Sequence, residues 1–271
     1  MTLQHARWAV GLLLAATATW SQALVFAVND GATYKVSDAD IRTRYAGLAA
    51  DLSKLLKQPV TIEPVSAYSV LRKGLADKQY DLAFVHPTHI SIEAINKSGY
   101  KLVAVTKGYQ QYSANFIVRA DASQKSLADL KGTKIGLPDQ DSITAWMVRA
   151  TLRDALGGEN QVDYVYTRFQ DAVPFFVENK LTKAGSTGSA AVVKAWQASG
   201  GKVLATSRAV PVKDIIASPT LPSDQVQLVR AYLLALDTSE EGKKKLEPMK
   251  FQGFASYSDA DMTAIGKWLG L

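Results

Sequence analysis

The feature that most constrains the fold of this chain is a regular alternation of short β-rich segments with longer helical segments. Residues 24–28 form an apolar, β-rich run, and apolar residues within 41–55 then recur every three or four positions, which is typical of an amphipathic helix. Similar pairs continue to about residue 105, and the series begins again at residue 115. This alternation predicts parallel sheets with helices on both faces. Because the series restarts, we expect an α/β protein with two lobes.

The two predicted lobes are not consecutive along the chain. The sequence after residue 222 is mostly helical in pattern and shows no strands of its own, so it must pack on a lobe that is already formed. We therefore predict that lobe 1 comprises residues 24–112 and 210–271, and that lobe 2 comprises residues 113–209. The chain would cross between the lobes twice, and these two crossings would form a hinge.

The N-terminus has the pattern of a secretory signal peptide over residues 1–23. His5 and Arg7 precede an apolar run over residues 8–18, and a small-residue motif ends at Ala23. The apolar run is shorter than the roughly 20 residues that span a bilayer. We expect cleavage after Ala23 and a periplasmic location. The chain has no cysteine, which excludes a lipid-anchored form, disulfides and thiol catalysis.

The charge of the chain indicates the class of partner. The sequence carries 31 Lys and Arg against 25 Asp and Glu, a net charge of +6. A basic balance favours an anionic ligand by long-range attraction, although solubility alone explains it equally well. No basic stripe with interleaved aromatic residues occurs, so we expect no nucleic-acid partner. No motif of a hydrolase, nucleotide-binding enzyme or metalloprotease is present, so we expect neither enzymatic activity nor a cofactor.

Two segments between a predicted strand and a predicted helix contain candidate ligand-binding residues. Ser142 and Thr144 lie where the free N–H groups of a first helical turn can bind an oxyanion, with the two hydroxyls as further donors. The alternative for Ser142 is ordinary N-capping. The second segment contains His86, Thr88 and His89. These histidines suit either ligand contact or half of a transition-metal site.

Five motifs appear in an order that resembles a known family. They are Tyr-Asp-Leu-Ala-Phe at 80–84, Ser-Leu-Ala-Asp-Leu-Lys-Gly at 126–132, the segment 139–144, Gln-Asp-Ala-Val at 170–173, and Lys-Ala-Gly at 183–185. The chain resembles the phosphate/phosphite/phosphonate-binding proteins of ABC importers, a branch of the type II periplasmic binding proteins. The resemblance implies the two-lobed type II fold with two hinge crossovers.

The resemblance also implies a set of ligand-binding residues. Tyr68 corresponds to an aromatic donor of the first lobe, Gln170 replaces the family's usual His, and Asp214 falls near an acidic family position. Acidic residues that some members carry are replaced by Ser-Thr-Gly at 186–188, which disfavours an amino-bearing phosphonate. The implied ligand set is Tyr68, His86, Thr88, Ser142, Thr144, Gln170, Thr187 and Asp214.

The function implied by the resemblance is capture of a small oxyanion by closure of the two lobes, followed by delivery to a membrane ABC permease. We expect a monomer. Two alternatives remain open at this point. One is a ligand-sensing partner of a membrane sensor protein, and the other is a metal or metal-chelate carrier that uses His86 and His89.

Overall fold

A computed structural model describes residues 22–31 and 36–271 of the chain. The predicted signal peptide falls almost entirely on residues 1–21, outside the described residues. Within the described part, no helix combines the length and the apolar character that crossing a membrane requires.

The first sheet has six strands in the order β11-β4-β10-β3-β1-β2. Strand β1 is parallel to β2 and β3, whereas β10 is antiparallel to both β3 and β4, and β11 is antiparallel to β4. The strands are β1 (Leu24–Val28), β2 (Val60–Pro64), β3 (Leu82–Val85), β4 (Lys101–Thr106), β10 (Asp214–Ala217) and β11 (Phe254–Ala255). We call this sheet with its helices lobe 1.

Helices cover both faces of the lobe 1 sheet because its strands are apolar on both sides. Along β1, Phe26 and Val28 pack against α1 and α7, whereas Ala27 belongs to the cluster formed with α2 and α3. This alternation is the period of two that a strand imposes on its side chains. The helices are α1 (Asp38–Leu56), α2 (Tyr68–Ala76), α3 (Thr88–Ser98), α7 (Ser223–Ala235), α8 (Glu240–Leu246) and α9 (Asp259–Leu269), with short 3₁₀ turns η3 (Leu236–Thr238) and η4 (Glu247–Met249).

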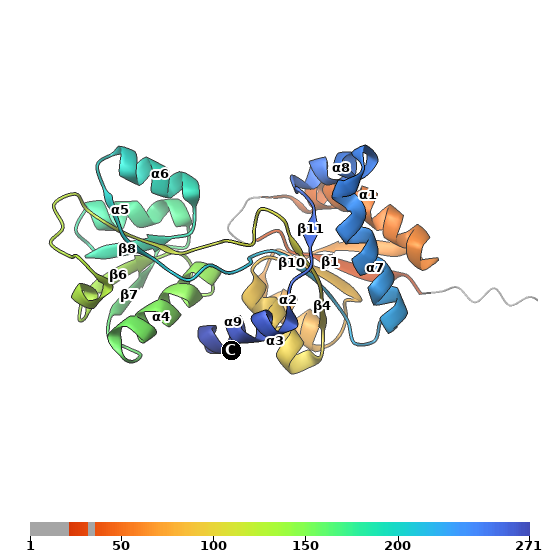
Figure 1. Cartoon of the computed structure of the whole chain (residues 1–271), viewed down its shortest axis with the longest axis horizontal. Helices are drawn as coiled ribbons and strands as arrows, with labels where there is room; N and C mark the ends of the chain where they lie inside the picture. Colours follow the sequence, from red (N-terminus) through yellow and green to blue (C-terminus); the bar gives the residue numbers. More distant parts are fainter. Residues whose placement is uncertain (1–21, 32–35) are drawn as a thin grey trace, which may run out of the picture.

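The second sheet has five strands in the order β7-β6-β8-β5-β9 and forms lobe 2 with its helices. Helix α4 packs on one face, and α5 and α6 pack on the other, where Ile117, Val177 and Trp196 share a cluster. The elements are β5 (Asn115–Val118), η1 (Leu127–Leu130), β6 (Lys134–Leu137), α4 (Ile143–Leu156), β7 (Asp163–Tyr166), η2 (Gln170–Ala172), α5 (Val173–Glu178), β8 (Ala184–Thr187), α6 (Ala190–Ala198) and β9 (Lys202–Thr206). The two lobes lie side by side (Figure 1).

The expectation that the sequence after residue 222 shows no strands of its own is wrong, because β11 extends the edge of the lobe 1 sheet beside β4. Strand β10, which precedes that stretch, was not predicted either, and it lies between β3 and β4 in the middle of the sheet. All four residues of β10 are buried. A four-residue strand buried on both faces shows no alternation of polar and apolar residues, and β11 has only two residues. Neither strand therefore produces a periodic sequence signal.

Two antiparallel chain segments connect the lobes. One leads from β4 to β5 and the other from β9 to β10, and they pair at an isolated bridge between Tyr112 and Val210. The Tyr112 N–H donates to the Val210 carbonyl at 3.0 Å, and the Val210 N–H donates to the Tyr112 carbonyl at 2.9 Å. This pairing makes the connection a two-stranded ribbon, which Figure 1 shows running between the lobes.

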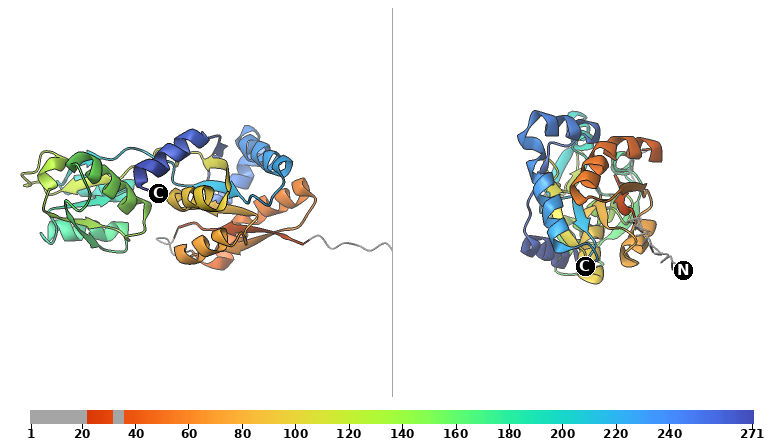
Figure 2. Two further views of the ribbon diagram at one scale, coloured as in Figure 1. Left: turned by 90° about the horizontal axis from the view of Figure 1, so that it is seen from below. Right: turned by 90° about the vertical axis from the view of Figure 1, so that its right-hand side faces the viewer.

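Helix α9 adds a third connection between the lobes. It packs against α3 of lobe 1 and α4 of lobe 2, and Figure 2 shows it lying where the two lobes adjoin. The Trp268 indole N–H donates to Asp154 Oδ2 at 2.9 Å, and the Arg153 guanidinium donates to the Trp268 carbonyl. The C-terminal helix α9 therefore contacts lobe 2, although the strand that precedes it, β11, belongs to lobe 1.

Candidate functional site

A cavity of about 50 Å³ lies between the lobes, close to the two connecting segments. Lobe 1, the Tyr112 connection and lobe 2 all contribute to its wall. The lining residues are Tyr68, His86, Pro87, Tyr112, Ser142, Ile143, Gln170, Gly188 and Ser189. Four of the eight residues in the predicted ligand set are among them. Drug-sized ligands occupy sites of roughly 300–1,000 Å³, so this cavity suits only a small ligand.

Four helices begin at this cavity. Tyr68 is the first residue of α2, and Pro87, Ser142 and Ser189 are the N-cap residues of α3, α4 and α6. The N-terminus of a helix carries a partial positive charge and N–H groups without a helical partner. The cavity wall therefore combines four such termini, two from each lobe. This arrangement favours a negatively charged ligand.

Ser142 caps its helix and also lines the cavity. Its Oγ accepts a hydrogen bond from the Ala145 N–H at 3.2 Å, which is the N-cap interaction that the sequence offered as an alternative. The hydroxyl retains its own proton because the Oγ acts only as an acceptor in that bond. Ser142 is 4% exposed, so a donor at this point faces the cavity in a largely desolvated setting.

Gln170 links the residues behind the cavity wall. Its Nε2 donates to Thr144 Oγ1 at 2.9 Å, and its Oε1 accepts from Thr187 Oγ1 at 2.8 Å and from the Gly188 N–H at 3.0 Å. Thr144 and Thr187 are both buried and do not line the cavity. The structure therefore brings the lobe 2 members of the predicted set together, with Gln170 at the cavity and the two threonines orienting it.

Tyr112 and Gly188 line the cavity although the predicted ligand set contains neither. The Tyr112 hydroxyl lies 2.7 Å from Thr144 Oγ1. A Cβ atom added to Gly188 would lie 1.9 Å from Tyr112 Oη, so only glycine leaves room for that ring. Tyr112 carried no distinguishing signal in the sequence, because it was one of several tyrosines near strand ends. Its role follows from its position in the connecting ribbon.

His86 lies on the lobe 1 side of the cavity next to a buried cation. Its Nδ1 is 3.3 Å from the Asp30 carbonyl oxygen. Desolvation of the ring, followed by the charge of Lys213, lowers the pKa of His86 to about 3. Lys213 is 8% exposed, and its Nζ lies 3.2 Å from Asp30 Oδ1 and above the Tyr109 ring. His86 is therefore neutral at physiological pH, and Lys213 beside it forms an ion pair with Asp30.

Thr88 and Asp214 form a separate buried polar group in the interior of lobe 1, behind the His86–Pro87 side of the cavity. Neither residue lines it. Asp214 begins β10 opposite Val85 and accepts a hydrogen bond from the Ser91 hydroxyl. Burial raises the pKa of Asp214 to about 7. The structure thus places these two predicted residues in the interior of lobe 1, packed between α3 and the sheet.

Outside the cavity, an ion-pair cluster connects the lobes. Arg72 in α2 donates to both carboxylate oxygens of Asp141 in lobe 2 and also to Glu93 in α3. His89 is fully buried, with its Nε2 3.4 Å from Asp141 Oδ1 and its ring stacked on Trp146 at 5.6 Å. Within the described residues, no group of three or more His, Cys, Asp or Glu side chains is arranged to hold a metal ion.

Solved structures with this architecture define the class of protein. PhnD1 from Prochlorococcus marinus, solved with methylphosphonate, has a TM-score of 0.65 at 15% identity over 91% of this chain and 96% of its own. XAC2383 from Xanthomonas citri, solved with ATP, has a TM-score of 0.75 at 13% identity over 92% and 98%. The aliphatic sulphonate-binding protein SsuA from Escherichia coli has a TM-score of 0.59 at 14% identity over 91% and 89%. The fold is that of a type II periplasmic binding protein.

The sequence itself identifies the family within this class. The profile of the phosphonate periplasmic substrate-binding proteins of ABC transporters matches residues 31–262. The chain belongs to this family, which confirms the resemblance derived from the five motifs. It is a periplasmic solute-binding transport protein, and a small ligand and a membrane permease are the partners that the family implies.

Proposed function

We propose that this protein binds a small phosphorus oxyanion, namely phosphate, phosphite or a short alkylphosphonate, between its lobes and delivers it to an ABC permease. The observation that carries the proposal is the meeting of four helix N-termini around one small cavity. Uncharged donors and helix dipoles hold an anion without the cost of burying a matching cation.

The polar side chains of the cavity wall narrow the ligand class. Hydroxyl groups of Tyr68, Tyr112, Ser142 and Ser189 supply donors around the ligand. The Gln170 amide donates to Thr144 and Tyr112 and so fixes the wall beside them. The lining contains no aspartate or glutamate, so an ammonium group on the ligand would have no counter-ion there. This supports an alkylphosphonate or inorganic oxyanion over an aminoalkylphosphonate.

The proposal keeps the ligand set given in the sequence analysis and assigns each residue a role according to its position in the fold. Tyr68, His86, Ser142 and Gln170 contact the ligand, Thr144 and Thr187 orient Gln170, and Thr88 and Asp214 support the α3 terminus from below. Lobe 1 is formed by residues 24–112 and 210–271, lobe 2 by residues 113–209. The protein acts as a monomer without catalytic activity, and its leader is removed after Ala23.

Lobe closure is the mechanism that follows from the position of the cavity. Ligand contacts come from both lobes, so binding stabilises the arrangement in which the lobes approach each other. The connecting ribbon at Tyr112 and Val210 is the hinge about which they move. The Tyr112 side chain reaches the cavity from that hinge. A ligand that contacts Tyr112 therefore favours the hinge angle at which the lobes are closed.

Isothermal titration calorimetry of the mature protein tests the proposal. We expect methylphosphonate, phosphite or phosphate to bind with 1:1 stoichiometry, and 2-aminoethylphosphonate to bind at least about tenfold more weakly than methylphosphonate. Gln170→Ala should weaken binding by about tenfold or more, because it removes the hydrogen bonds that join Thr144, Thr187 and the Gly188 N–H behind the cavity wall. Gln197→Ala, which removes the same amide from the exposed face of α6, is the matched control.

Two results would contradict this function. One is the absence of heat for all three phosphorus oxyanions while a carboxylate or a divalent metal binds. The other is an unchanged radius of gyration in small-angle scattering at saturating ligand, because closure brings the lobes together. Metal-dependent stabilisation that is lost in a His86→Ala/His89→Ala variant would instead support a metal carrier.

A further inference from the structure

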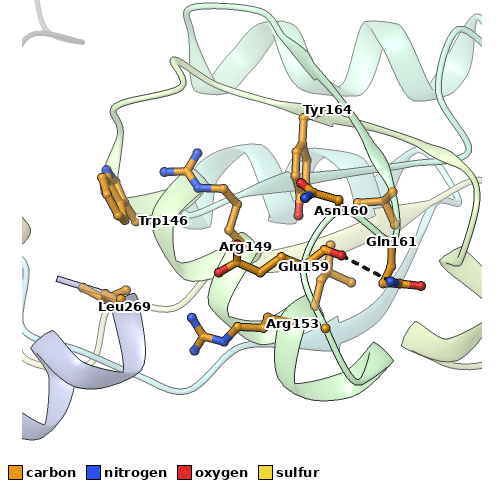
Figure 3. A pocket seen from close by; sticks show the side chains of 12 residues that line it. Trp146, Arg149, Arg153, Glu159, Asn160, Gln161, Tyr164 and Leu269 are labelled. Atoms are coloured by element: carbon orange, nitrogen blue, oxygen red, sulfur yellow. Dashed lines mark hydrogen bonds between the residues drawn. The ribbon is translucent and has the colours of Figure 1, made fainter.

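A second and larger cavity lies at the edge of lobe 2, beside α4 and β7. Its volume is about 250 Å³. Figure 3 shows it bounded by α4, the segment 158–162, β7 and the end of α9. It is separate from the cavity between the lobes, with which it shares no lining residue. The proposed transport function does not use it.

Arg149 supplies this cavity with an uncompensated positive charge. Its guanidinium donates to the Gln140 carbonyl at 3.0 Å and to the Tyr166 hydroxyl at 3.4 Å, and it lies 4.6 Å from the centre of the Trp146 ring. Among the described residues, no carboxylate lies within ion-pairing distance of Arg149. A half-buried arginine that bonds only to neutral groups retains donors for a carboxylate or phosphate.

Arg153 lies one turn further along α4 and adds a second guanidinium. It donates to the Trp268 carbonyl and lies 3.3 Å from Asp154, so its charge is partly compensated. Figure 3 shows both guanidinium groups directed toward the side of the cavity where Trp146 and Leu269 lie. Glu159 is the single acidic side chain in the lining, and it is exposed to solvent.

The remaining wall is mixed. Leu152 and Val162 are buried, at 2% and 8% exposure. Trp146, Tyr164 and Leu269 make up the rest of its apolar and aromatic part, and Asn160 and Gln161 add polar side chains. Burial raises the pKa of Tyr164 to about 12, so its hydroxyl is a hydrogen-bond donor at every physiological pH. A site with an arginine at one end and one aromatic and apolar side matches a ligand with an anionic head and an apolar body.

We propose that the cavity between α4 and α9 is a second binding site, which takes a small organic carboxylate. The carboxylate pairs with Arg149, and the apolar body packs against Trp146, Tyr164 and Leu269. Its size is suited to a single ring, because an apolar protein cavity of about 150 Å³ already admits benzene. A ligand bound here touches both lobe 2 and α9.

Sodium benzoate is the probe for this site, and benzamide is its neutral isostere. In calorimetry on the full mature protein saturated with its phosphorus oxyanion, we expect benzoate to bind once per chain. Benzamide should bind at least about tenfold more weakly, because it lacks the charge that pairs with Arg149. Arg149→Gln should weaken benzoate binding by a similar factor, and Arg149→Lys, which keeps the charge but not the planar fork, by less.

Matched variants separate this site from the cavity between the lobes. Gln170→Ala should leave benzoate affinity unchanged, and Arg149→Gln should leave oxyanion affinity unchanged. In the unaltered protein, benzoate should shift the indole N–H resonance of Trp146 in NMR spectra, assigned with Trp146→Phe. The shift is measured on the unaltered protein, and the variant serves only to assign the resonance.

The proposal is overturned if benzoate does not bind at millimolar concentrations, or if benzamide binds equally well. It is also overturned if Gln170→Ala or saturating oxyanion abolishes benzoate binding while Arg149→Gln retains it, because benzoate would then occupy the cavity between the lobes. None of these outcomes bears on oxyanion binding, so the two proposals fail independently.

Discussion

The guanidinium of Arg72 in lobe 1 holds both carboxylate oxygens of Asp141 in lobe 2, with Nη2 2.9 Å from Oδ1. The two side chains are about 30% exposed, and Asp141 immediately precedes the N-cap residue of α4. The hydrogen bonds from His89 and Arg72 lower the pKa of Asp141 despite its burial. A bidentate pair of this kind is stronger than an ordinary surface ion pair, and this one joins the two lobes beside the cavity.

The first prediction is that this pair contributes to ligand affinity. Arg72→Gln should weaken oxyanion binding by about 3- to 10-fold, equivalent to about 1 kcal/mol, because the closed arrangement loses a contact between lobes. Lys73→Gln is the matched control, because Lys73 pairs with Asp77 on its own helix and is 75% exposed. Equal affinities of the two variants in calorimetry would show that the pair does not act on closure.

The second prediction concerns the charge at the cavity wall. Gln170→Glu should weaken oxyanion binding more than Gln170→Ala does, because it places a carboxylate where the ligand is negative. We expect a further loss of about tenfold at low ionic strength, and a smaller loss in high salt, which screens the repulsion. Titrations of both variants at two salt concentrations measure this. A Glu variant that binds as well as the Ala variant would contradict an anionic ligand.

The third prediction follows from the close approach of Gly188 and Tyr112. Gly188→Ala should destabilise the protein by about 1–3 kcal/mol and weaken ligand binding, because the new methyl group displaces the Tyr112 ring. Gly47→Ala is the control, since Gly47 lies within α1 with no atom within 4 Å of the added Cβ. That variant should be more stable by about 0.5–1 kcal/mol. Chemical denaturation compares them, and similar behaviour of the two variants would refute the prediction.

The fourth prediction is a pH dependence of stability that arises at Asp214. Its pKa is raised to about 7 in the folded protein, against about 3.9 for an unperturbed aspartate. Below about pH 4 the Asp214 carboxyl is protonated in both the folded and the unfolded protein, so it does not lower the stability. Between about pH 4 and pH 7 it loses its proton in the unfolded chain but keeps it in the folded protein. The free energy of unfolding therefore falls as pH rises, by at most about 1.4 kcal/mol per pH unit. Above about pH 7 the loss of stability is constant.

Asp214→Asn should remove this dependence. The difference in unfolding free energy between the variant and the unaltered protein should move in favour of the variant as pH rises from about 4 to about 7. The amide oxygen can still accept the hydrogen bond from Ser91. Asp121→Asn, at an exposed site in lobe 2, controls for loss of one negative charge. A difference that is the same at every pH would show that Asp214 ionises normally.

The start of α4 was predictable because capping is local. Ser142 caps α4 by bonding the Ala145 N–H three residues later, and Ser37 and Ser258 cap α1 and α9 in the same way. The alternation of strands and helices likewise involves neighbours in the chain. The α/β class follows from such patterns, whereas the type II fold and the family follow from the resemblance of the five motifs, and both are confirmed.

The site was only partly predictable because its contacts join residues that are far apart in the chain. Tyr112 reaches Thr144 across 32 residues, Arg72 reaches Asp141 across 69, and Ser91 reaches Asp214 across 123. No periodicity or cap encodes which of several tyrosines or arginines meets a distant partner. Asp214, taken from the family resemblance, lies inside lobe 1 because β10 inserts between β3 and β4, and Thr88 is buried at the start of α3.

The sequence by itself determined the α/β class and the strand–helix segments that end at the site, because hydrophobic periodicity and turn chemistry act between neighbouring residues. Its five ordered motifs determined the family. Only the tertiary structure decided that four helix starts surround one cavity, that Tyr112 enters it from the hinge, and that α9 closes a second cavity against α4. These features depend on how sheets twist and lobes pack, which bring together residues that have no local relationship in the chain.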